Sequence, residues 1–298
     1  FQRAQIDIAV LEVGMGGRLD TVNLLDADAA LVTTIGIDHV EWLGPDRESI
    51  GREKAGIFRR GRPAICGDPD PPQSLLTQAD TVAAPLYRVT HDFGYRLYPD
   101  TWSWWGQHPG QSREKYDELP YPALRGAFQI QNAAAVLMVL GQIKQSFPVS
   151  RADICRGLTT VNLPGRFQVI TGAVTRIFDV AHNPHGAQVL AAALRVHPCQ
   201  GRTLAVFGML ADKDISGVLR VMQGSVDIWY MAGLAVTRGA AGDSLAQQLL
   251  ALQPTATVRA HVNVQEAYAQ ALAEAQGHDR IVVFGSFYTV AAALQQTL

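Results

Sequence analysis

Residues 176–196 read RIFDVAHNPHGAQVLAAALRV and place a strand, a polar turn and a helix in immediate succession. Arg176 to Val180 is a short, mainly apolar run of the kind that forms a buried strand. Pro184 to Val196 has helical spacing, and Asn183 followed by Pro184 favours a helix start. Asn caps the free amides of a first turn, and Pro suits its first position. The stretch therefore predicts one strand–helix unit of an α/β fold.

The same alternation continues to the end of the chain. Predicted strands cover residues 202–208, 226–231, 257–260 and 280–284, and predicted helices cover residues 215–222, 243–252, 264–276 and 288–298. Strands that alternate with helices through short connections predict a mostly parallel sheet covered by helices. Ligands of such folds bind at the carboxyl ends of the strands.

The first half of the chain is less regular. We expect buried strands over residues 6–13, 29–37 and 64–66, and helices over residues 47–58, 129–143 and 151–159. Residues 86–122 are rich in Tyr and Trp, which indicates a small antiparallel excursion. Its Trp side chains could stack on a ligand, but packing on a sheet face is the more common arrangement. Residues 162–166, NLPGR, interrupt the pattern. We place the domain boundary there, with one domain over residues 1–163 and a second over residues 164–298.

Composition excludes several classes of protein. The 298 residues are 48% apolar and 17% charged, with a formal net charge of −2. This balance is unlike a basic nucleic-acid surface or a polybasic membrane anchor, and no apolar run approaches the roughly 18 residues of a membrane span. The three cysteines, Cys66, Cys155 and Cys199, are far apart. They indicate free thiols in a reducing compartment.

Polar motifs follow the strands expected in the first half. Residues 11–20, LEVGMGGRLD, resemble a dinucleotide loop, but a GxGxxG motif would need glycine where Leu19 stands. Glu12 at a strand end needs a salt-bridge partner or a metal if it is buried. His39 follows the next strand, and both side chains could converge on a hard cation such as Mg²⁺. Lys54 lies on the following helix and is either a surface lysine or a charge aimed at a phosphate.

The second half offers a further group of polar residues. A bare helix start explains Asn183 and Pro184, but it requires neither Asp179 nor His182. His182 and His185 lie on either side of the helix start, without a third ligand at clear spacing, so a zinc site is not indicated. Arg166 is either a linker cap or a guanidinium that neutralises phosphate charge.

These motifs together resemble the folylpolyglutamate synthase/dihydrofolate synthase family of the Mur ligase superfamily, and the bifunctional proteobacterial form most of all. The matching stretches cover nearly the whole chain. They are LEVGMGGRLDTVN (11–23), TTIGIDHVEWLG (33–44), SIGREKAGIF (49–58), LRGAFQIQNAAA (124–135), LPGRFQ (163–168), FDVAHNPHGA (178–187), FGMLADKDI (207–215) and GSFYTV (285–290). Their order and combination are more specific than any one of them. The family often has His where Phe128 stands, which we interpret as a tolerated difference.

The resemblance implies a fold and a set of residues for the first domain. The fold is α/β: an incomplete P-loop NTPase-like Mur ligase central domain, followed by a Rossmann-like C-terminal domain with a mostly parallel sheet. By resemblance, Glu12 and His39 are Mg²⁺ ligands, and Lys54 matches a catalytic lysine that family members carry as a carbamate. Asn132 matches a residue on the adenine side of ATP. The pterin substrate site is implied at Leu19, Asp20 and Thr21.

The resemblance also assigns residues of the second domain. Arg166 and Asp179 are implied to contact ATP, and His182 is implied to be catalytic and to lie near the same nucleotide. In related ligases this face receives the amino acid that is added. The expected glutamate-binding residues are Lys213 and Ser286, with His182 nearby.

The activity implied is that of an ATP-dependent ligase that joins L-glutamate to dihydropteroate or to a reduced folate through an acyl phosphate. The implied ligands are ATP, Mg²⁺, glutamate and the pterin substrate, and the implied state is a cytoplasmic monomer without nucleic-acid or membrane partners. Two alternatives stay open: another Mur-type ligase acting on a cell-wall nucleotide precursor, and a non-catalytic remnant that binds only nucleotide or a partner.

The phosphate-binding loop of such an enzyme is not in the sequence. Family members have a G-x-x-G-K-[ST] loop upstream of the Glu12 motif, whose amides and lysine hold the phosphates. The four lysines of this chain, at 54, 115, 144 and 213, never follow a glycine, and five residues precede the first predicted strand. We therefore expect the chain to be N-terminally truncated and inactive alone.

Overall fold

The chain forms two compact units in the computed structural model, which describes residues 2–107, 113–124, 126–197 and 199–297. The N-terminal unit comprises Phe1–Pro122 and Gln129–Thr160, and the C-terminal unit comprises Ala123–Phe128 and Val161–Leu298. The division after Thr160 lies three residues before the expected domain boundary. Each unit has its own hydrophobic clusters.

The N-terminal unit contains a short parallel sheet of order β1-β2-β3. These strands are β1 (Ala30–Val32), β2 (Ala64–Cys66) and β3 (Leu86–Arg88). Two 3-10 turns belong to the same unit, η1 (Gln2–Ala4) and η2 (Thr21–Leu24). Its first three α-helices are α1 (Val40–Leu43), α2 (Arg47–Ala55) and α3 (Gln73–Thr81). The helix α2 begins with a capping box, in which Asp46 and Ser49 satisfy each other's backbone amides.

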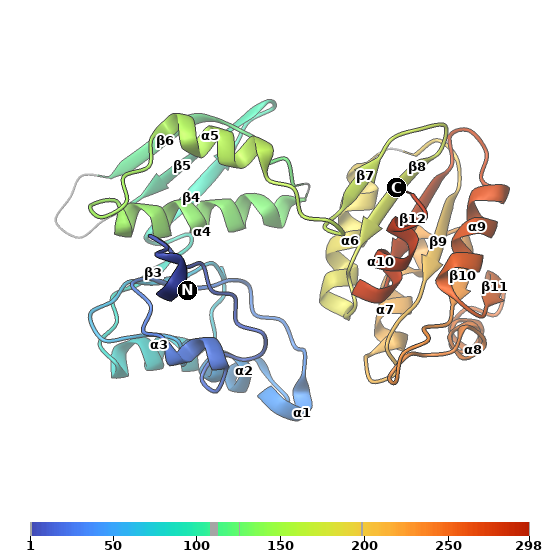
Figure 1. The fold of residues 1–298 in the computed structure, drawn as a ribbon, viewed down its shortest axis with the longest axis horizontal. Helices are drawn as coiled ribbons and strands as arrows, with labels where there is room; N and C mark the ends of the chain where they lie inside the picture. Colours follow the sequence, from blue (N-terminus) through green and yellow to red (C-terminus); the bar gives the residue numbers. More distant parts are fainter. Residues whose placement is uncertain (1, 108–112, 125, 198, 298) are drawn as a thin grey trace. The chain divides into compact units, whose positions relative to one another are not determined.

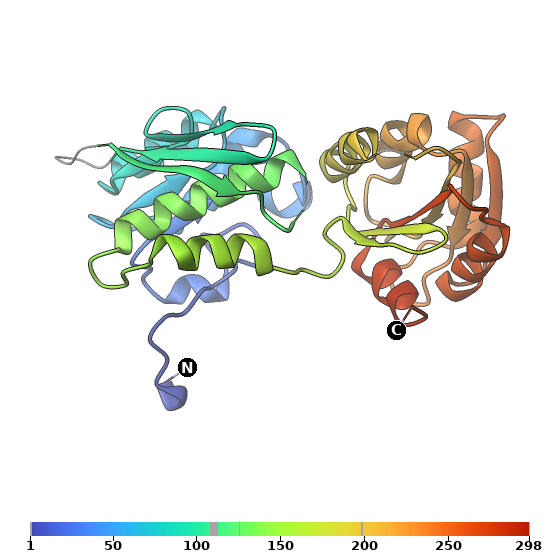
Figure 2. The ribbon, with the colours of Figure 1, turned by 90° about the horizontal axis from the view of Figure 1, so that it is seen from above.

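A second, antiparallel sheet in this unit follows the expected Trp-rich excursion. It has the order β4-β5-β6 and consists of β4 (Phe93–Leu97), β5 (Thr101–Gly106) and β6 (Glu114–Pro120). The helices α4 (Ala127–Ile143) and α5 (Arg151–Thr160) accompany it (Figure 2). Trp102 and Trp104 are buried, and the Trp104 indole donates a hydrogen bond to the Ala134 carbonyl on α4 at 3.0 Å. The prediction that the Trp side chains pack on a sheet face is confirmed for Trp102 and Trp104, whereas Trp105 alternates to the other face and is partly exposed.

The strand predicted over residues 6–13 is wrong. This segment is extended but pairs with no strand among the described residues, since β1 lies at the edge of its sheet and bonds only to β2. Its large apolar side chains from Ile6 to Leu11 are exposed, to 93% at Val10. An apolar run predicts burial, but a strand also needs a neighbouring backbone to bond to, and that neighbour cannot be deduced from the run itself.

The C-terminal unit is built around a six-stranded sheet of order β11-β10-β9-β12-β8-β7. Its strands are β7 (Gln168–Ile170), β8 (Thr175–Asp179), β9 (Thr203–Phe207), β10 (Ile228–Ala232), β11 (Thr257–His261) and β12 (Arg280–Phe284). Only the β7–β8 ladder is antiparallel among the described pairs. The predicted mostly parallel sheet is confirmed, and the antiparallel edge strand β7 was not anticipated.

Helices cover both faces of this sheet (Figure 1). They are α6 (Pro184–Val196), α7 (Ile215–Met222), α8 (Gly242–Leu252), α9 (Val264–Glu274) and α10 (Phe287–Leu294), with the 3-10 turn η3 (Gln223–Ser225) after α7. Along β9, Ala205 and Phe207 join the hydrophobic cluster that contains α6, α7 and α8. Leu204 and Val206 join the cluster that contains α9 and α10. This double burial explains the continuous apolar strands of the second half.

The close approach of β9 and β12 at their carboxyl ends depends on a glycine. Gly285 follows β12 with φ of +112°, and a Cβ atom there would overlap the carbonyl oxygen of Gly208, which follows β9. We expect Gly285→Ala to lower the free energy of unfolding by at least about 2 kcal/mol, because both the backbone conformation and the space exclude a side chain. Urea denaturation of the C-terminal unit measures this.

A matched control is available in the same unit. Gly277 lacks a positive φ, and a Cβ atom added there would meet no other atom within 4 Å. We expect Gly277→Ala to stay within about 0.5 kcal/mol of the wild type. Equal effects of the two substitutions would show that the Gly208–Gly285 contact is not the cause.

Candidate functional site

Most residues of the GGRLD motif hold the motif itself against the end of α2. The Arg18 amide donates to the Glu53 carbonyl at 2.9 Å, and the Arg18 guanidinium pairs with the Glu53 carboxylate at 2.9 Å. A Cβ atom at Gly17 would lie 2.9 Å from the Glu53 carbonyl oxygen and 3.0 Å from that of Lys54. The motif therefore fixes its own loop against the helix that carries Lys54.

Asp20 is an organising residue of this loop. Its carboxylate accepts hydrogen bonds from the amides of Gly14 at 2.9 Å, Met15 at 3.1 Å and Val22 at 3.0 Å, and it caps η2. These bonds, the one from Val22 first, hold the pKa of Asp20 below its ordinary value. The pterin role expected of Asp20 stays a prediction, and its three backbone bonds provide a structural reason for an Asp here. Leu19 and Thr21 flank it and are exposed.

Two residues near this motif escaped the sequence argument. Asn23 donates to the carbonyls of Arg18 and Gly56 at 3.1 and 3.2 Å, and Arg59 donates to the Asn23 carbonyl and side-chain oxygens at 2.8 and 2.9 Å. Both lie within or beside the motif stretches of the sequence. Both are polar residues at the end of a family motif, and this position was the only sign in the sequence that they hold the two motifs together.

The expected metal ligands lie in exposed loops of the N-terminal unit. Glu12 is exposed and lies within the unpaired segment of residues 6–13, and His39 precedes α1 in a left-handed conformation with φ of 52°. Within the part of the chain that the structure describes, no three His, Cys, Asp or Glu side chains gather as a metal site. An exposed carboxylate still suits Mg²⁺, which takes one or two protein carboxylates and keeps several waters. The Glu12 carboxylate is thus compatible with the ion, whereas an imidazole such as that of His39 is a less usual ligand for Mg²⁺.

Lys54 is half-buried, and burial lowers the pKa of its ammonium group, although the nearby Asp38 carboxylate opposes this effect. Asp38 also accepts the His39 amide at 2.8 Å. Its carboxylate therefore acts electrostatically on the lysine of α2 while it fixes the loop that carries His39. Asp38 lies in the stretch TTIGIDHVEWLG, but the sequence predicted a role only for its neighbour His39.

A buried carboxylate after β2 positions the start of this same loop. Asp68 is 2% exposed and accepts the Ile35 amide at 2.7 Å, the Asp70 amide at 2.9 Å and the Arg47 guanidinium at 2.9 Å. Arg47 in turn donates to the Ile35 carbonyl at 3.1 Å. Asp68 and Arg47 thus tie β1, β2 and α2 together a few residues before His39. The sequence did show a carboxylate shortly after a predicted strand, but the prolines that follow it made the segment look like an ordinary loop.

Asn132 lies on α4 and is partly exposed. Its neighbour Gln131 donates to the Gly67 carbonyl at 2.6 Å and to the Thr34 hydroxyl at 3.1 Å. These bonds join α4 to the carboxyl ends of β1 and β2. The nucleotide role of Asn132 stays a prediction.

The site residues expected in the C-terminal unit lie at the carboxyl ends of neighbouring strands of its sheet. Asp179 ends β8, Ser286 follows β12, and Lys213 lies in the loop after β9. These three strands are adjacent, in the order β9-β12-β8. The helix after β12 covers the opposite face from those after β8 and β9. These strand ends therefore have the crossover geometry at which open α/β sheets bind ligands.

Asp179 is engaged by the backbone around it. Its two carboxylate oxygens accept the amides of Phe167 at 2.9 Å and Ala181 at 2.8 Å. Burial raises the pKa of Asp179, against the effects of these bonds and of the nearby Arg166 and His182 charges. A contact of Asp179 with ATP stays a prediction.

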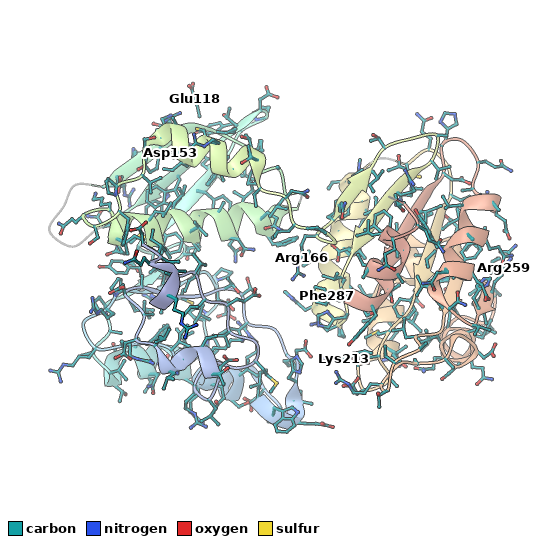
Figure 3. The ribbon with its side chains drawn as sticks, viewed as in Figure 1. Glu118, Asp153, Arg166, Lys213, Arg259 and Phe287 are labelled. Carbon is teal, nitrogen blue, oxygen red and sulfur yellow. The ribbon has the colours of Figure 1, made fainter. Side chains whose placement is uncertain are left out.

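His182 and Arg166 meet the same aromatic ring. The centroid of the exposed Phe287 ring lies 5.6 Å from the Arg166 guanidinium carbon (Figure 3). The same centroid is 6.3 Å from that of the His182 ring. The Nδ1 atom of His182 is 2.9 Å from the Val180 carbonyl, so Nδ1 carries the proton in the neutral ring and Nε2 is the basic atom. Phe287 escaped the sequence argument, although it lies inside the GSFYTV motif.

The two expected glutamate-binding residues differ in their surroundings. The Ser286 side chain is buried and caps α10, where it accepts the Thr289 amide at 3.0 Å. Lys213 is partly exposed in the loop before α7. The predicted Asn183 cap is confirmed, since its side chain accepts the Gly186 amide at 2.7 Å and Pro184 opens α6.

Comparisons with known proteins agree with this architecture. The family described as "Mur ligase, glutamate ligase domain" matches residues 165–287. The dihydrofolate synthase/folylpolyglutamate synthase of Escherichia coli K12 is 41% identical over 295 residues, which are 99% of this chain and 66% of that protein. The structure of E. coli FolC in complex with DHPP and ADP aligns with a TM-score of 0.90 and 41% identity, over 99% of this chain and 67% of that one.

A bifunctional folylpolyglutamate synthase/dihydrofolate synthase structure with Mn, AMPPNP and L-glutamate bound has 42% identity and a TM-score of 0.86, over 99% of this chain and 68% of that one. The fold is that of the Mur ligases. The chain belongs to the dihydrofolate synthase/folylpolyglutamate synthase family, and it spans 66% of the length of the E. coli relative. None of the helices in the described part of the chain is long and apolar enough to cross a bilayer.

Replacing the buried carboxylate tests the loop anchor. We expect Asp68→Asn to lower the free energy of unfolding of the N-terminal unit by about 2 kcal/mol, because it removes a charge-assisted bond to Arg47 and leaves a buried amide short of an acceptor. Asp70→Asn is the matched control, since the Asp70 side chain is 91% exposed and contacts the same guanidinium. We expect it to change stability by less than about 0.5 kcal/mol. Similar losses in both variants would argue against a special role of Asp68.

The Asp20 turn makes a pH-dependent prediction. Because the folded pKa of Asp20 is lowered, its contribution to stability is present above its ordinary pKa of 3.8 and is lost as the pH falls through the lowered value. The amide resonances of Met15 and Val22 should therefore titrate with a midpoint below 3.8, measured by NMR. The Asp20→Asn variant should show no such titration. A midpoint at or above 3.8 would contradict the three-bond arrangement.

Proposed function

We propose that the chain contributes to an ATP-dependent ligase that adds L-glutamate to dihydropteroate, to folyl(poly)glutamate, or to both. The proposal rests on one observation: Asp179, Ser286 and Lys213 lie together at the carboxyl ends of three adjacent strands of the C-terminal sheet. Those strand ends lie in the segment matching a glutamate ligase domain. Relatives with DHPP and ADP, or with Mn, AMPPNP and L-glutamate, support the choice of substrates.

The proposed reaction has two chemical steps. The substrate carboxylate attacks the γ-phosphorus of ATP, which forms an acyl phosphate and releases ADP. The neutral amine of glutamate then attacks the acyl carbon, the amide bond forms, the amine gives up a proton, and phosphate leaves. Charge neutralisation and positioning supply most of the catalysis in such phosphoryl transfers.

In this proposal the N-terminal unit binds ATP, the metal and the pterin, and the C-terminal unit binds glutamate. Glu12 and His39 would hold the divalent cation, with Mg²⁺ as the physiological ion. When bound, it neutralises phosphate charge. Leu19, Asp20 and Thr21 would line the pterin site. Asn132 would lie at the adenine.

The groups of the C-terminal unit have distinct tasks. Arg166 offers an exposed guanidinium that can neutralise phosphate charge, with the Phe287 ring packed against it. Nε2 of His182 is the basic atom of its ring and can take the proton that the glutamate amine gives up. Lys213 and Ser286 would contact glutamate. The protein would act as a monomer in the cytoplasm.

We further propose that Lys54 is carried as a carbamate. Only a neutral amine adds to carbon dioxide, and burial lowers the pKa of Lys54, which increases the neutral fraction at a given pH. Conversion would replace a half-buried cation by an anion able to bind a metal. ¹³C NMR of protein equilibrated with ¹³C-bicarbonate should give one carbamate resonance that is lost in Lys54→Arg and kept in Lys144→Arg.

The 298 residues contain no Gly-Lys-Ser or Gly-Lys-Thr triplet. We therefore propose that they do not turn over ATP alone. The same observation favours a second candidate, a non-catalytic remnant that binds nucleotide or a partner. Reading the genomic sequence 5′ of the Phe1 codon separates the two, because a ligase requires an in-frame phosphate-binding loop and a remnant does not.

The activity test follows ADP release with dihydropteroate or tetrahydrofolate plus L-glutamate. It compares the 298-residue chain with the longer product wherever the reading frame continues upstream of Phe1. Release that depends on both pterin and glutamate supports the proposal. No release by a longer product that contains the phosphate-binding loop would contradict it, and release only with a cell-wall nucleotide precursor would indicate another Mur-type ligase.

In an active preparation, Arg166→Gln should lower kcat at least about 100-fold, because it removes a cation that faces transferred phosphate charge. Arg220→Gln is the matched control, since Arg220 is an exposed arginine of α7 in the same unit. Its kcat should equal that of the wild type. Equal kcat values for both variants would remove Arg166 from the mechanism.

A further inference from the structure

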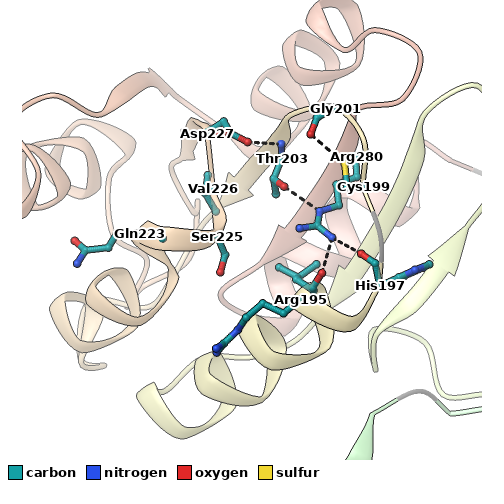
Figure 4. A pocket seen from close by; sticks show the side chains of 12 residues that line it. Arg195, His197, Cys199, Gly201, Thr203, Gln223, Ser225, Val226, Asp227 and Arg280 are labelled. Atoms are coloured by element: carbon teal, nitrogen blue, oxygen red, sulfur yellow. Dashed lines mark hydrogen bonds between the residues drawn. The ribbon is translucent and has the colours of Figure 1, made fainter.

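A cavity of about 540 Å³ lies at the edge of the C-terminal sheet opposite to the proposed glutamate site. It is formed where β9 and β12 begin, between the end of α6 and the turn η3 (Figure 4). Among its lining residues are Thr203, Ser225, Asp227 and Arg280. No motif of the family resemblance falls here. The proposed ligase chemistry leaves these side chains without a task.

The Arg280 guanidinium is only partly used by the protein. Its Nε donates to the Thr203 hydroxyl at 2.9 Å, and its Nη1 donates to the carbonyls of Leu194 and His197, each at 2.8 Å. These last two bonds cap the end of α6. Nη2 has no hydrogen-bond partner among the described residues, and the guanidinium lies beside the cavity (Figure 4). Capping α6 therefore accounts for Nη1 but not for Nη2.

Two residues with hydroxyl groups, Thr203 and Ser225, line the same cavity. Thr203 is 4% exposed, and its Oγ1 accepts from Arg280, so its own proton remains available to a ligand. Ser225 contributes a second hydroxyl to the lining. A guanidinium nitrogen with two hydroxyls matches the oxygens of a carboxylate or phosphate.

Asp227 gives the cavity an opposite charge as well. One of its carboxylate oxygens accepts the Thr203 amide at 2.7 Å, and the Asp227 amide donates to the Thr203 carbonyl at 2.9 Å. This pairing fixes the carboxylate at the rim, close enough to act electrostatically on Arg280. A plain anion would meet attraction from Arg280 and repulsion from Asp227. Arg195 also lines the cavity, and its Nε donates to the Ala191 carbonyl at 3.3 Å. A ligand that carries both charges would match both groups.

We propose that this cavity binds a small zwitterion of the α-amino acid class. Its carboxylate would accept from Arg280 Nη2 and the Ser225 and Thr203 hydroxyls, and its ammonium group would donate to Asp227. The volume lies within the range of small-molecule sites, about 300–1,000 Å³. This inference does not rest on the proposed ligase function, because it concerns the other edge of the sheet and uses none of the residues assigned there.

The test is NMR titration of the ¹⁵N-labelled 298-residue chain with glycine, L-alanine, acetate, methylammonium and inorganic phosphate. We expect glycine or L-alanine to cause saturable shifts of the Thr203, Ser225 and Asp227 amides, and the singly charged probes to bind more weakly. Acetate or phosphate binding as tightly as glycine would overturn the proposal in favour of a plain anion site. No saturable shift with any probe would overturn it altogether.

Matched variants locate the two ends of the ligand. Asp227→Asn keeps an oxygen for the Thr203 amide but loses the charge, so we expect glycine to bind roughly tenfold more weakly and acetate to bind no more weakly than before. Asp243→Asn makes the same change at an exposed residue of α8 and should have no effect. If Asp227→Asn does not fold, Ser225→Ala replaces it and should weaken glycine and acetate alike. Unchanged glycine affinity in the folded variant would contradict the proposal.

Discussion

When a parallel sheet is buried on both faces, polar side chains can reach solvent and ligands only at the amino and carboxyl ends of its strands. In the C-terminal unit, the strands β9, β10 and β12 consist almost entirely of buried apolar residues. Charged and hydroxyl side chains therefore collect where strands begin or end. The family motifs occupy the carboxyl edge, and Arg280 and Asp227 occupy the amino edge. Both proposed sites follow from this one constraint.

The N-terminal unit solves a different problem, since its parallel strands are only three residues long. Side-chain hydrogen bonds and ion pairs add to the few backbone hydrogen bonds that such short strands can form. Asp68 and Arg47 join the ends of β1 and β2 to α2, and Arg18 joins the glycine loop to Glu53 on the same helix. The helix α2 thus holds two loops at once, and it also carries Lys54. Many of the family motif residues in this unit therefore hold the loops in place.

Strand–helix units with strong caps could be predicted from the sequence. The range Pro184–Val196 of α6 follows from Asn183, Pro184 and the apolar spacing, and the strands Ala64–Cys66 and Arg280–Phe284 have the predicted bounds. The helix α3 was missed because residues 73–81 are largely polar and follow prolines. The antiparallel strand β7 was missed because three residues carry too little pattern to show a direction.

The candidate site could be predicted only in part, for a related reason. Motif positions are readable because residue types and spacing are local. Partners such as Asp68 for Arg47, or Phe287 for Arg166, depend on which strand ends become neighbours in the folded sheet. Sequence alone also could not reveal that Asp20, Asp179 and Ser286 are already bonded to backbone amides. Those bonds keep the loops in place before any ligand arrives.

The place of β12 in the sheet has a consequence for the order in which the unit can be completed. This strand lies between β8 and β9, yet it follows both by more than seventy residues. While a ribosome is still adding residues before 280, β8 has no ladder to β9, and the sheet remains in two parts with unpaired backbone at the seam. The last helix and the Arg280 cap of α6 arrive with the same segment. The sheet of the C-terminal unit is therefore closed only when residues 280–284 have been made, and release of the chain before that point would leave its centre open.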